Sequence, residues 1–227
     1  MNTLESYYKE KLYPLQDGLL SFIKKSDLPF YLTGGTALSR HYFHHRYSDD
    51  LDLFLNNNKN FSSYTENLIK KISQNFSVDN NRFLKSENHI RLFIIEDNVE
   101  LKVDFINDTA EHFGEFELDE IIGKVDNLRN ILSNKITCLY RLDIKDIVDI
   151  WIISKHLKFK WDEIIREANI KQAGIDPLTI NQILTTYPDN LLSKIKWIEI
   201  VDTKKFNQDV RKIAEDILMN RTNLLSQ

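Results

Sequence analysis

The sequence predicts an α+β fold: a mixed sheet with flanking helices, followed by a helical C-terminal half. Two observations support this prediction. Apolar runs between residues 76 and 106 have the two-residue period of strands, and the last run, 99–106, alternates cleanly. From about residue 118 the apolar residues recur at helical spacing to the end of the chain. We therefore expect two domains, an α/β domain over residues 1–118 and a helical domain over residues 119–227.

The elements of the first domain are expected in the following order. Residues 3–26 have helical spacing, and Pro14 is expected to restart this helix as a first-turn proline. The last two strands are expected to form a hairpin, because Asp97 and Asn98 make a two-residue turn between them. The other predicted elements are a strand at 30–32, a helix at 36–45, a strand at 49–55, a helix at 61–74, and strands at 76–78, 82–84, 89–95 and 99–106.

The second domain is expected to contain helices only. Pro177 and Pro188 mark helix starts, and Gly174 marks a break. The predicted helices cover residues 127–141, 144–156, 161–169, 177–186, 189–197 and 206–219.

The composition is that of an ordinary globular protein. Hydrophobic residues make up 42% of the 227 residues and charged residues 28%, with a net charge of −4. The one cysteine, Cys138, excludes an internal disulfide and suits a reducing compartment. No segment is long and apolar enough to span a membrane, and the N-terminus lacks a signal-peptide pattern. We therefore expect a cytoplasmic protein with no membrane partner.

Acidic residues on two expected strands indicate a metal site. Alternate side chains of a strand share a face, so Asp50 and Asp52 are expected to point the same way. Two carboxylates this close repel each other unless a cation lies between them, and a divalent metal is the usual solution. Asp104 lies near the end of the strand 99–106, with Lys102 on the same side. We interpret Asp50, Asp52 and Asp104 as catalytic ligands of Mg²⁺ or Mn²⁺.

A nucleotide site is predicted beside these acids. Gly34 and Gly35 place backbone N–H groups at the mouth of a helix, where phosphate binds well. Arg46 is expected to pair with an aspartate or with phosphate, and Ser48 to cap a turn or contact phosphate. The predicted nucleotide-binding residues are Gly34, Gly35, Thr36, Arg46, Ser48 and Lys102. Phosphate-binding glycines beside metal carboxylates indicate phosphoryl or nucleotidyl transfer, whereas the Asp-x-Asp pattern alone is more often a solvated turn.

The order of these motifs resembles the AbiEii/AbiGii-type nucleotidyltransferase toxins of the DNA polymerase β-like superfamily. The resemblance covers about residues 28–155 and includes the segments 34–38, 45–54, 102–105 and 135–150. It implies a nucleotidyltransferase-like fold and an enzyme that moves a nucleoside monophosphate from a nucleoside triphosphate (NTP) to an acceptor hydroxyl, with tRNA as a candidate acceptor. It also implies a toxin of a bacterial toxin–antitoxin or phage-defence system, with a cognate antitoxin as partner.

The resemblance also implies catalytic residues in the helical half. Lys135 is expected to contact the triphosphate, and Asp146 or Asp149 to position a ligand or fix Lys135. The alternative is ion pairing among Arg141, Lys145 and these aspartates, which contributes little on a solvated helix. For Asp149 the two interpretations remain open.

Two other functions are compatible with the same residues. One is a catalytically inactive nucleotide-binding protein of the same fold that acts by interaction. The other is a metal-dependent phosphohydrolase or nuclease.

Overall fold

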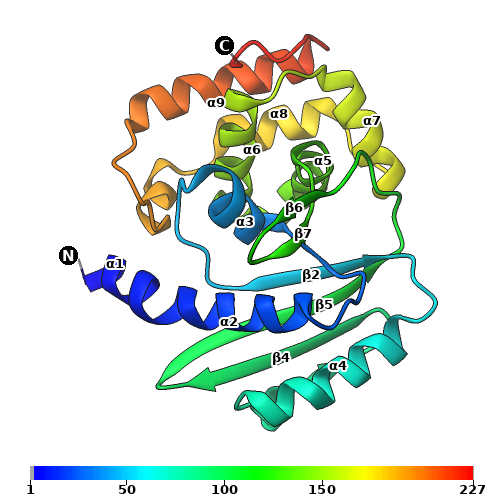
Figure 1. The fold of residues 1–227 in the computed structure, drawn as a ribbon. Helices are drawn as coiled ribbons and strands as arrows, with labels where there is room; N and C mark the ends of the chain where they lie inside the picture. The colour runs from blue at the N-terminus through cyan, green and yellow to red at the C-terminus, as the bar shows by residue number, and fades with distance from the viewer. Residues whose placement is uncertain (1–2, 227) are drawn as a thin grey trace. The chain divides into compact units, whose positions relative to one another are not determined.

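A computed structural model describes residues 3–226, and the chain divides into two compact units (Figure 1). The first unit consists of Met1–His41, Tyr47–Thr109 and Phe116–Asp126. The second consists of Tyr42–Arg46, Ala110–Glu115 and Asn127–Gln227. Each unit is therefore built from several stretches of chain, a feature that the predicted division into 1–118 and 119–227 does not contain.

Within the described residues, the first unit is organised around a seven-stranded mixed sheet in the order β3-β4-β5-β2-β1-β7-β6. β2 runs parallel to β5 and antiparallel to β1, while β1 runs parallel to β7. The sheet with its helices confirms the predicted fold class. The strands are β1 (Tyr31–Thr33), β2 (Leu51–Asn56), β3 (Leu84–Lys85), β4 (His89–Glu96), β5 (Val99–Asp108), β6 (Glu117–Asp119) and β7 (Gly123–Val125).

The predicted hairpin is formed by β4 and β5. Asp97 and Asn98 both have positive φ, 47° and 62°, as the favoured two-residue hairpin turn requires. On β5 the apolar side chains of one face are buried, and those of Lys102 and Asp104 alternate with them. Burial of each large apolar side chain stabilises the unit by about 1.5–3 kcal/mol. The buried residues of this face are Val99, Leu101, Val103 and Phe105.

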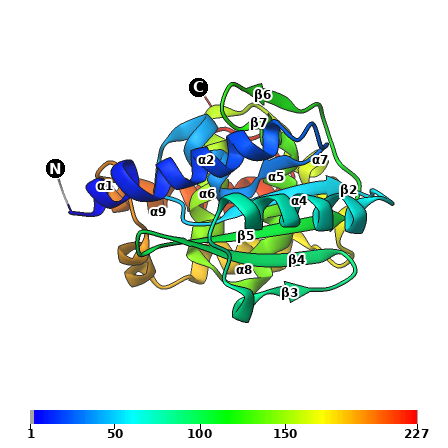
Figure 2. The same ribbon diagram turned by 60° about the horizontal axis from the view of Figure 1, so that its bottom comes forward.

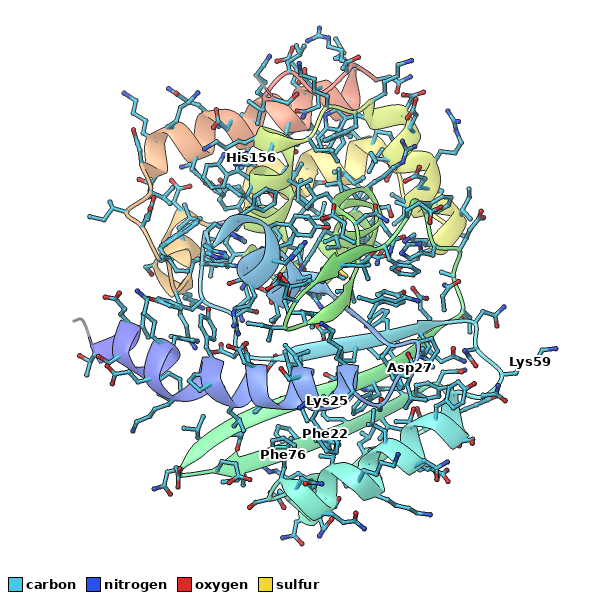
Figure 3. The ribbon with its side chains drawn as sticks, viewed as in Figure 1. Phe22, Lys25, Asp27, Lys59, Phe76 and His156 are labelled. Carbon is cyan, nitrogen blue, oxygen red and sulfur yellow. The ribbon has the colours of Figure 1, made fainter. Side chains whose placement is uncertain are left out.

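Two helices, α2 (Tyr13–Lys24) and α4 (Phe61–Asn75), lie side by side on one face of this sheet (Figures 1 and 2). The rings of Phe22 and Phe76 meet edge to face with centroids 5.7 Å apart (Figure 3). The predicted helix 3–26 is confirmed as α1 (Thr3–Tyr7), a π-helical turn (Tyr8–Leu12) and α2, with Pro14 in the first turn of α2.

The helix after the glycine pair lies two residues earlier than predicted, over residues 34–43 instead of 36–45. It begins at Gly34 with α3 (Gly34–Ala37), continues as a π-helical segment (Leu38–Phe43), and has ended before residue 45. His44 has a φ of 52°, which breaks the helix.

Several strand and helix predictions are wrong. Residues 117–119 and 123–125 form β6 and β7, not helices, because three-residue strands are too short to show a period. Residues Asn80–Arg82 form a 3₁₀ turn with Asp79 as its N-cap, so the strand predicted at 82–84 is reduced to β3. Residues 76–78 contribute only a bridge between Val78 and Ile94. The helix predicted at 189–197 is a 3₁₀ segment, Asp189–Lys194.

The second unit is helical. Its α6 packs against α5 and α9, while α8 packs along α9 and α7 along α5. Aspartates cap three of these helices, because Asp143, Asp176 and Asp202 each accept backbone N–H groups of the following turn. The helices are α5 (Leu128–Cys138), α6 (Ile144–His156), α7 (Trp161–Lys171), α8 (Pro177–Thr186) and α9 (Thr203–Leu218). None of the helices in residues 3–226 is long and apolar enough to cross a membrane.

Candidate functional site

The glycine turn after β1 lies directly against an aspartate of β2. Gly34 has a φ of 69°, a conformation that glycine adopts without strain. A Cβ atom at this position would lie 3.0 Å from Oδ2 of Asp52, and Thr33 pairs with Asp52 across the two strands. Both the backbone conformation and the close approach therefore require glycine here. The turn and the Asp52 carboxylate form one structural feature.

Three predicted metal ligands lie on or directly before the neighbouring strands β2 and β5. Asp52 and Asp104 are directly paired in the parallel register, so their side chains share a face. Asp50 lies in the loop just before β2, since the strand begins at Leu51 and not at residue 49 as predicted. Lys102 connects Asp50 to the same face: its Nζ lies 2.6 Å from Asp50 Oδ2 and 3.7 Å from Asp104 Oδ2. We call Asp50, Asp52, Asp104 and Lys102 the carboxylate face.

Two side chains of β4 hold Asp104. Arg91 donates from Nε and Nη2 to the two Asp104 oxygens at 2.8 and 3.1 Å, and His89 Nε2 lies 2.5 Å from Oδ1. Burial alone would raise the pKa of Asp104, but the hydrogen bonds from Arg91 and His89 hold that pKa below its ordinary value. Asp104 is therefore a carboxylate at neutral pH.

Arg91 and His89 were not among the residues predicted from the sequence. The signal that locates Arg91 is the turn at Asp97 and Asn98. Counting back from a two-residue turn places Arg91 opposite Asp104, which is the register that the hairpin has.

The loop that carries Asp50 is fixed by buried hydroxyl groups. Thr36 Oγ1 donates to the backbone carbonyl of Asp50 and lies 2.8 Å from Ser48 Oγ. Gln16 Nε2 donates to the carbonyls of Ser48 and Asp49 at 3.2 and 3.1 Å. Thr36 and Ser48 therefore hold the backbone on which Asp50 is mounted. Their contact with phosphate stays a prediction.

The carboxylate face accepts a cation. The Lys102 ammonium lies between oxygens of Asp50 and Asp104, and carboxylate oxygens are the ligands that Mg²⁺ and Mn²⁺ prefer. Burial would lower the pKa of Lys102, but its hydrogen bond to Asp50 raises it, so the lysine is charged. Among residues 3–226, no three acidic, histidine or cysteine side chains are already grouped as a metal site. The donors suit a divalent ion at the position that Lys102 holds.

The residues predicted in the helical half form a buried ion network in the second unit. Lys135 Nζ lies 2.9 Å from Asp146 Oδ1 and 2.8 Å from Asp149 Oδ2. Arg46 makes a two-point contact with Asp149, Nε to Oδ1 at 2.9 Å and Nη2 to Oδ2 at 2.8 Å. Arg141 likewise pairs with Asp146. Both aspartate side chains are 0% exposed.

Lys135 and Asp149 are both charged in the buried ion network. Burial would lower the pKa of Lys135, but the Asp149 and Asp146 carboxylates raise it. Burial would raise the pKa of Asp149, but the Arg46 guanidinium and the Lys135 ammonium hold it well below its usual range. Removing one partner of such a network leaves a buried charge unpaired. The structure thus brings Arg46, Lys135 and Asp146 into one network, and their contact with a nucleotide stays a prediction.

Paired carboxylates on adjacent strands beside a glycine turn define a nucleotidyltransferase class of fold, and solved structures agree. The chain is similar to the crystal structure of JHP933 from Helicobacter pylori, with a TM-score of 0.62, 17% identity and 93% of each chain covered. It is also similar to MenT4, a nucleotidyltransferase toxin from Mycobacterium tuberculosis H37Rv, with a TM-score of 0.64 and 15% identity over 94% of this chain and 85% of that one. At these identities the similarity shows the fold.

The family is shown by sequence. The AbiEii family of nucleotidyl transferase toxins, from type IV toxin–antitoxin systems, matches residues 21–220. This chain belongs to that family, which confirms the resemblance seen in its motifs. No curated protein sequence matches the chain.

Proposed function

We propose that this protein transfers a nucleoside monophosphate from an NTP to an acceptor hydroxyl, releases pyrophosphate, and depends on Mg²⁺ or Mn²⁺. The observation that carries the proposal is the register of Asp52 opposite Asp104 on parallel strands, with Gly34 directly against Asp52. Membership of a nucleotidyltransferase toxin family supports the same chemistry.

Each residue of the carboxylate face has a role in this proposal. Asp50, Asp52 and Asp104 hold the divalent ion, which when bound supplies charge stabilisation at the transferring phosphoryl group and the leaving pyrophosphate. Lys102, displaced from Asp50, neutralises the triphosphate. The N–H groups of the turn at Gly34 and Gly35 bind phosphate oxygens.

The acceptor oxygen attacks the α-phosphorus, and the bond from that phosphorus to the bridging oxygen breaks, so pyrophosphate leaves. Asp104 takes up the hydroxyl proton. Because Arg91 and His89 hold the pKa of Asp104 low, Asp104 is a weak base as long as both contacts are intact. Loosening of the Arg91 contact is therefore part of the proposed step.

We propose RNA, and tRNA in particular, as the acceptor, and a cognate antitoxin as the partner that controls the toxin in the cytoplasm. The family supports the antitoxin, because its toxins belong to type IV toxin–antitoxin systems. A role in phage defence is proposed on the same basis.

Label transfer tests the proposal. Purified protein is incubated with each of four labelled NTPs, total RNA, and Mg²⁺ or Mn²⁺, and label in RNA is measured. Asp52→Asn should reduce transfer about 10³-fold, because several kcal/mol of charge stabilisation is lost. Glu100→Gln is the matched control, since Glu100 is an exposed acid of β5 that pairs with Arg82. Its activity should equal that of the unchanged protein.

A second candidate, nucleotide binding without turnover, is favoured by one observation: Lys102 and Arg91 already pair with Asp50 and Asp104. It predicts NTP binding with no label in any product. A nuclease or phosphohydrolase would instead give shortened RNA or released nucleotide.

A further inference from the structure

The second unit contains an aromatic pocket of about 470 Å³. Its lining comes from residues 43–45, from the C-terminal half of α6, and from the chain around residues 197–205. Six aromatic rings contribute to the lining, together with the ammonium groups of Lys155 and Lys205. The rings are those of Phe43, His44, His45, Trp151, His156 and Trp197, and His156 marks the place of the pocket in Figure 3.

The rings present flat surfaces at several orientations. Phe43 stacks on His156, with centroids 4.8 Å apart and an interplanar angle of 25°. Trp151 meets Trp197 edge to face at 6.4 Å, and the Lys155 ammonium lies 4.6 Å from the centroid of the Trp151 ring. Burial and the nearby Lys155 lower the pKa of His156, so its imidazole is neutral at pH 7. Flat apolar rings beside the Lys155 ammonium group suit a planar aromatic ligand that carries a negative charge.

His45 is one of the lining residues and contains a buried hydrogen-bond acceptor. Its side chain is 5% exposed, and its Nε2 lies 3.1 Å from Asp149 Oδ1. Burial lowers the pKa of His45, so the ring is neutral. A carboxylate can only accept, so the proton is on Nε2 and Nδ1 is left as an acceptor. This buried Nδ1 has no hydrogen-bond partner within the protein. Such unsatisfied groups are uncommon, and a ligand N–H would satisfy this one.

The charged side chains that line the pocket are those of Lys155, Glu199, Asp202 and Lys205, and among them the Lys155 ammonium lies over the Trp151 ring. Lys205 pairs with Asp209 at 2.8 Å, and the carboxylate of Asp202 accepts backbone N–H groups at the start of α9. Lys155 is exposed and lies beside the rings.

We propose that this pocket binds one nucleotide of a single-stranded RNA acceptor: the base stacks on the rings of Phe43 and Trp197, a base N–H donates to His45 Nδ1, and Lys155 contacts the phosphate. The inference rests on the proposed transferase function and specifies its acceptor as an RNA with at least one unpaired base. Stacking on aromatic side chains with cationic contacts to the backbone is the usual mode of single-strand recognition.

Tryptophan fluorescence gives a direct test, because all three tryptophans of the chain, Trp151, Trp161 and Trp197, belong to the second unit. The probes are a single-stranded RNA hexamer, the same hexamer in a duplex, CMP, and N4,N4-dimethyl-CMP. The hexamer and CMP should quench the fluorescence, and the duplex should quench less. Phe43→Leu should weaken hexamer binding about fivefold or more, the lower end of what loss of one base stack costs.

Two further variants separate the contacts. Lys155→Ala should weaken the hexamer several-fold, whereas Lys158→Ala, a nearby exposed lysine outside the pocket, should not. His45→Gln keeps an N–H for Asp149 but has no acceptor at the Nδ1 position. The unchanged protein should therefore prefer CMP over dimethyl-CMP, and His45→Gln should bind both equally. Thermal midpoints of each variant show whether it is folded, and Lys155→Ala, at an exposed position, tests the pocket even if His45→Gln unfolds.

The proposal is overturned if no nucleotide probe changes the fluorescence, as expected of a pocket for a protein partner, or if Lys155→Ala and Lys158→Ala act alike. Failure of the transferase proposal can be distinguished from failure of the pocket proposal. Asp52→Asn should lose label transfer and keep hexamer binding. A protein that binds the hexamer through this pocket but transfers no label refutes the transferase proposal alone.

Discussion

The molecule carries two clusters of the same charged groups, and they differ in their access to water. On the carboxylate face the side chains of Asp50 and Lys102 are 41% and 28% exposed. In the buried ion network those of Asp149 and Lys135 are 0% and 9% exposed. Exposed pairs contribute little and exchange partners readily, whereas a buried charge that loses its partner is costly. Loss of one partner is therefore expected to cost more in the buried ion network than between Asp50 and Lys102.

The largest expected effect follows from breaking the buried ion network. Asp149→Ala should lower the free energy of unfolding by about 3–5 kcal/mol, because Lys135 and Arg46 are left buried without their shared carboxylate. Asp50→Ala should change it by about 1 kcal/mol or less. Urea unfolding measures both. Equal losses for the two variants would remove the distinction between the clusters.

The pH dependence of stability sharpens the same comparison. The folded pKa of Asp149 lies well below its unfolded value near 3.9, so its stabilisation is complete above about pH 4 and is lost as the pH falls through the folded pKa. Asp149→Asn should therefore be less stable at neutral pH and should show a flatter loss below pH 4. Urea midpoints between pH 2 and 7 test this expectation, and parallel profiles for the two proteins would contradict it.

Substitution of the glycine beside the carboxylate face should have an intermediate effect on stability. Gly34→Ala should destabilise by about 1–2 kcal/mol and reduce label transfer, because alanine is strained at a φ of 69° and its Cβ would meet Asp52. Gly18→Ala is the control: Gly18 lies within α2 with no atom within 4 Å of an added Cβ, and the change should stabilise by about 0.5–1 kcal/mol. Thermal unfolding of both variants shows whether each substitution lowers or raises the stability.

The smallest expected change in stability is that of Lys102→Met, below about 1 kcal/mol. It should match Lys85→Met, which breaks an exposed pair with Glu66. The two variants should differ in function: only Lys102→Met should raise the KM for NTP, since Lys102 faces the proposed triphosphate. If Lys102→Met instead lowered the free energy of unfolding strongly, the lysine would have a structural role.

The strands of the site could be predicted from the sequence because apolar and polar residues alternate along them. The alternation in residues 99–106 gave the face of Asp104, and the turn at Asp97 and Asn98 gave the hairpin. β6 and β7 were missed because three residues carry no period, and β7 is defined by pairing with β1 from far along the chain.

The burial of Lys135 and Asp146 was also not predicted. α6 is buried over most of its surface, so its apolar residues do not mark one inward face, and nothing in the spacing shows that Asp146 and Asp149 lie inside. Whether a charged side chain is buried or exposed depends on the packing of the whole unit, and helical periodicity alone does not predict that packing.

The interleaved path of the chain limits how this protein can be dissected. His45 and Arg46 lie early in the sequence but belong to the same unit as Asp149, which follows about a hundred residues later. A truncation after Asp126 would leave the His45 imidazole and the Arg46 guanidinium in a fragment that lacks the Asp149 carboxylate. Neither half should then behave as a module for expression or domain exchange, and intact activity should require the continuous polypeptide.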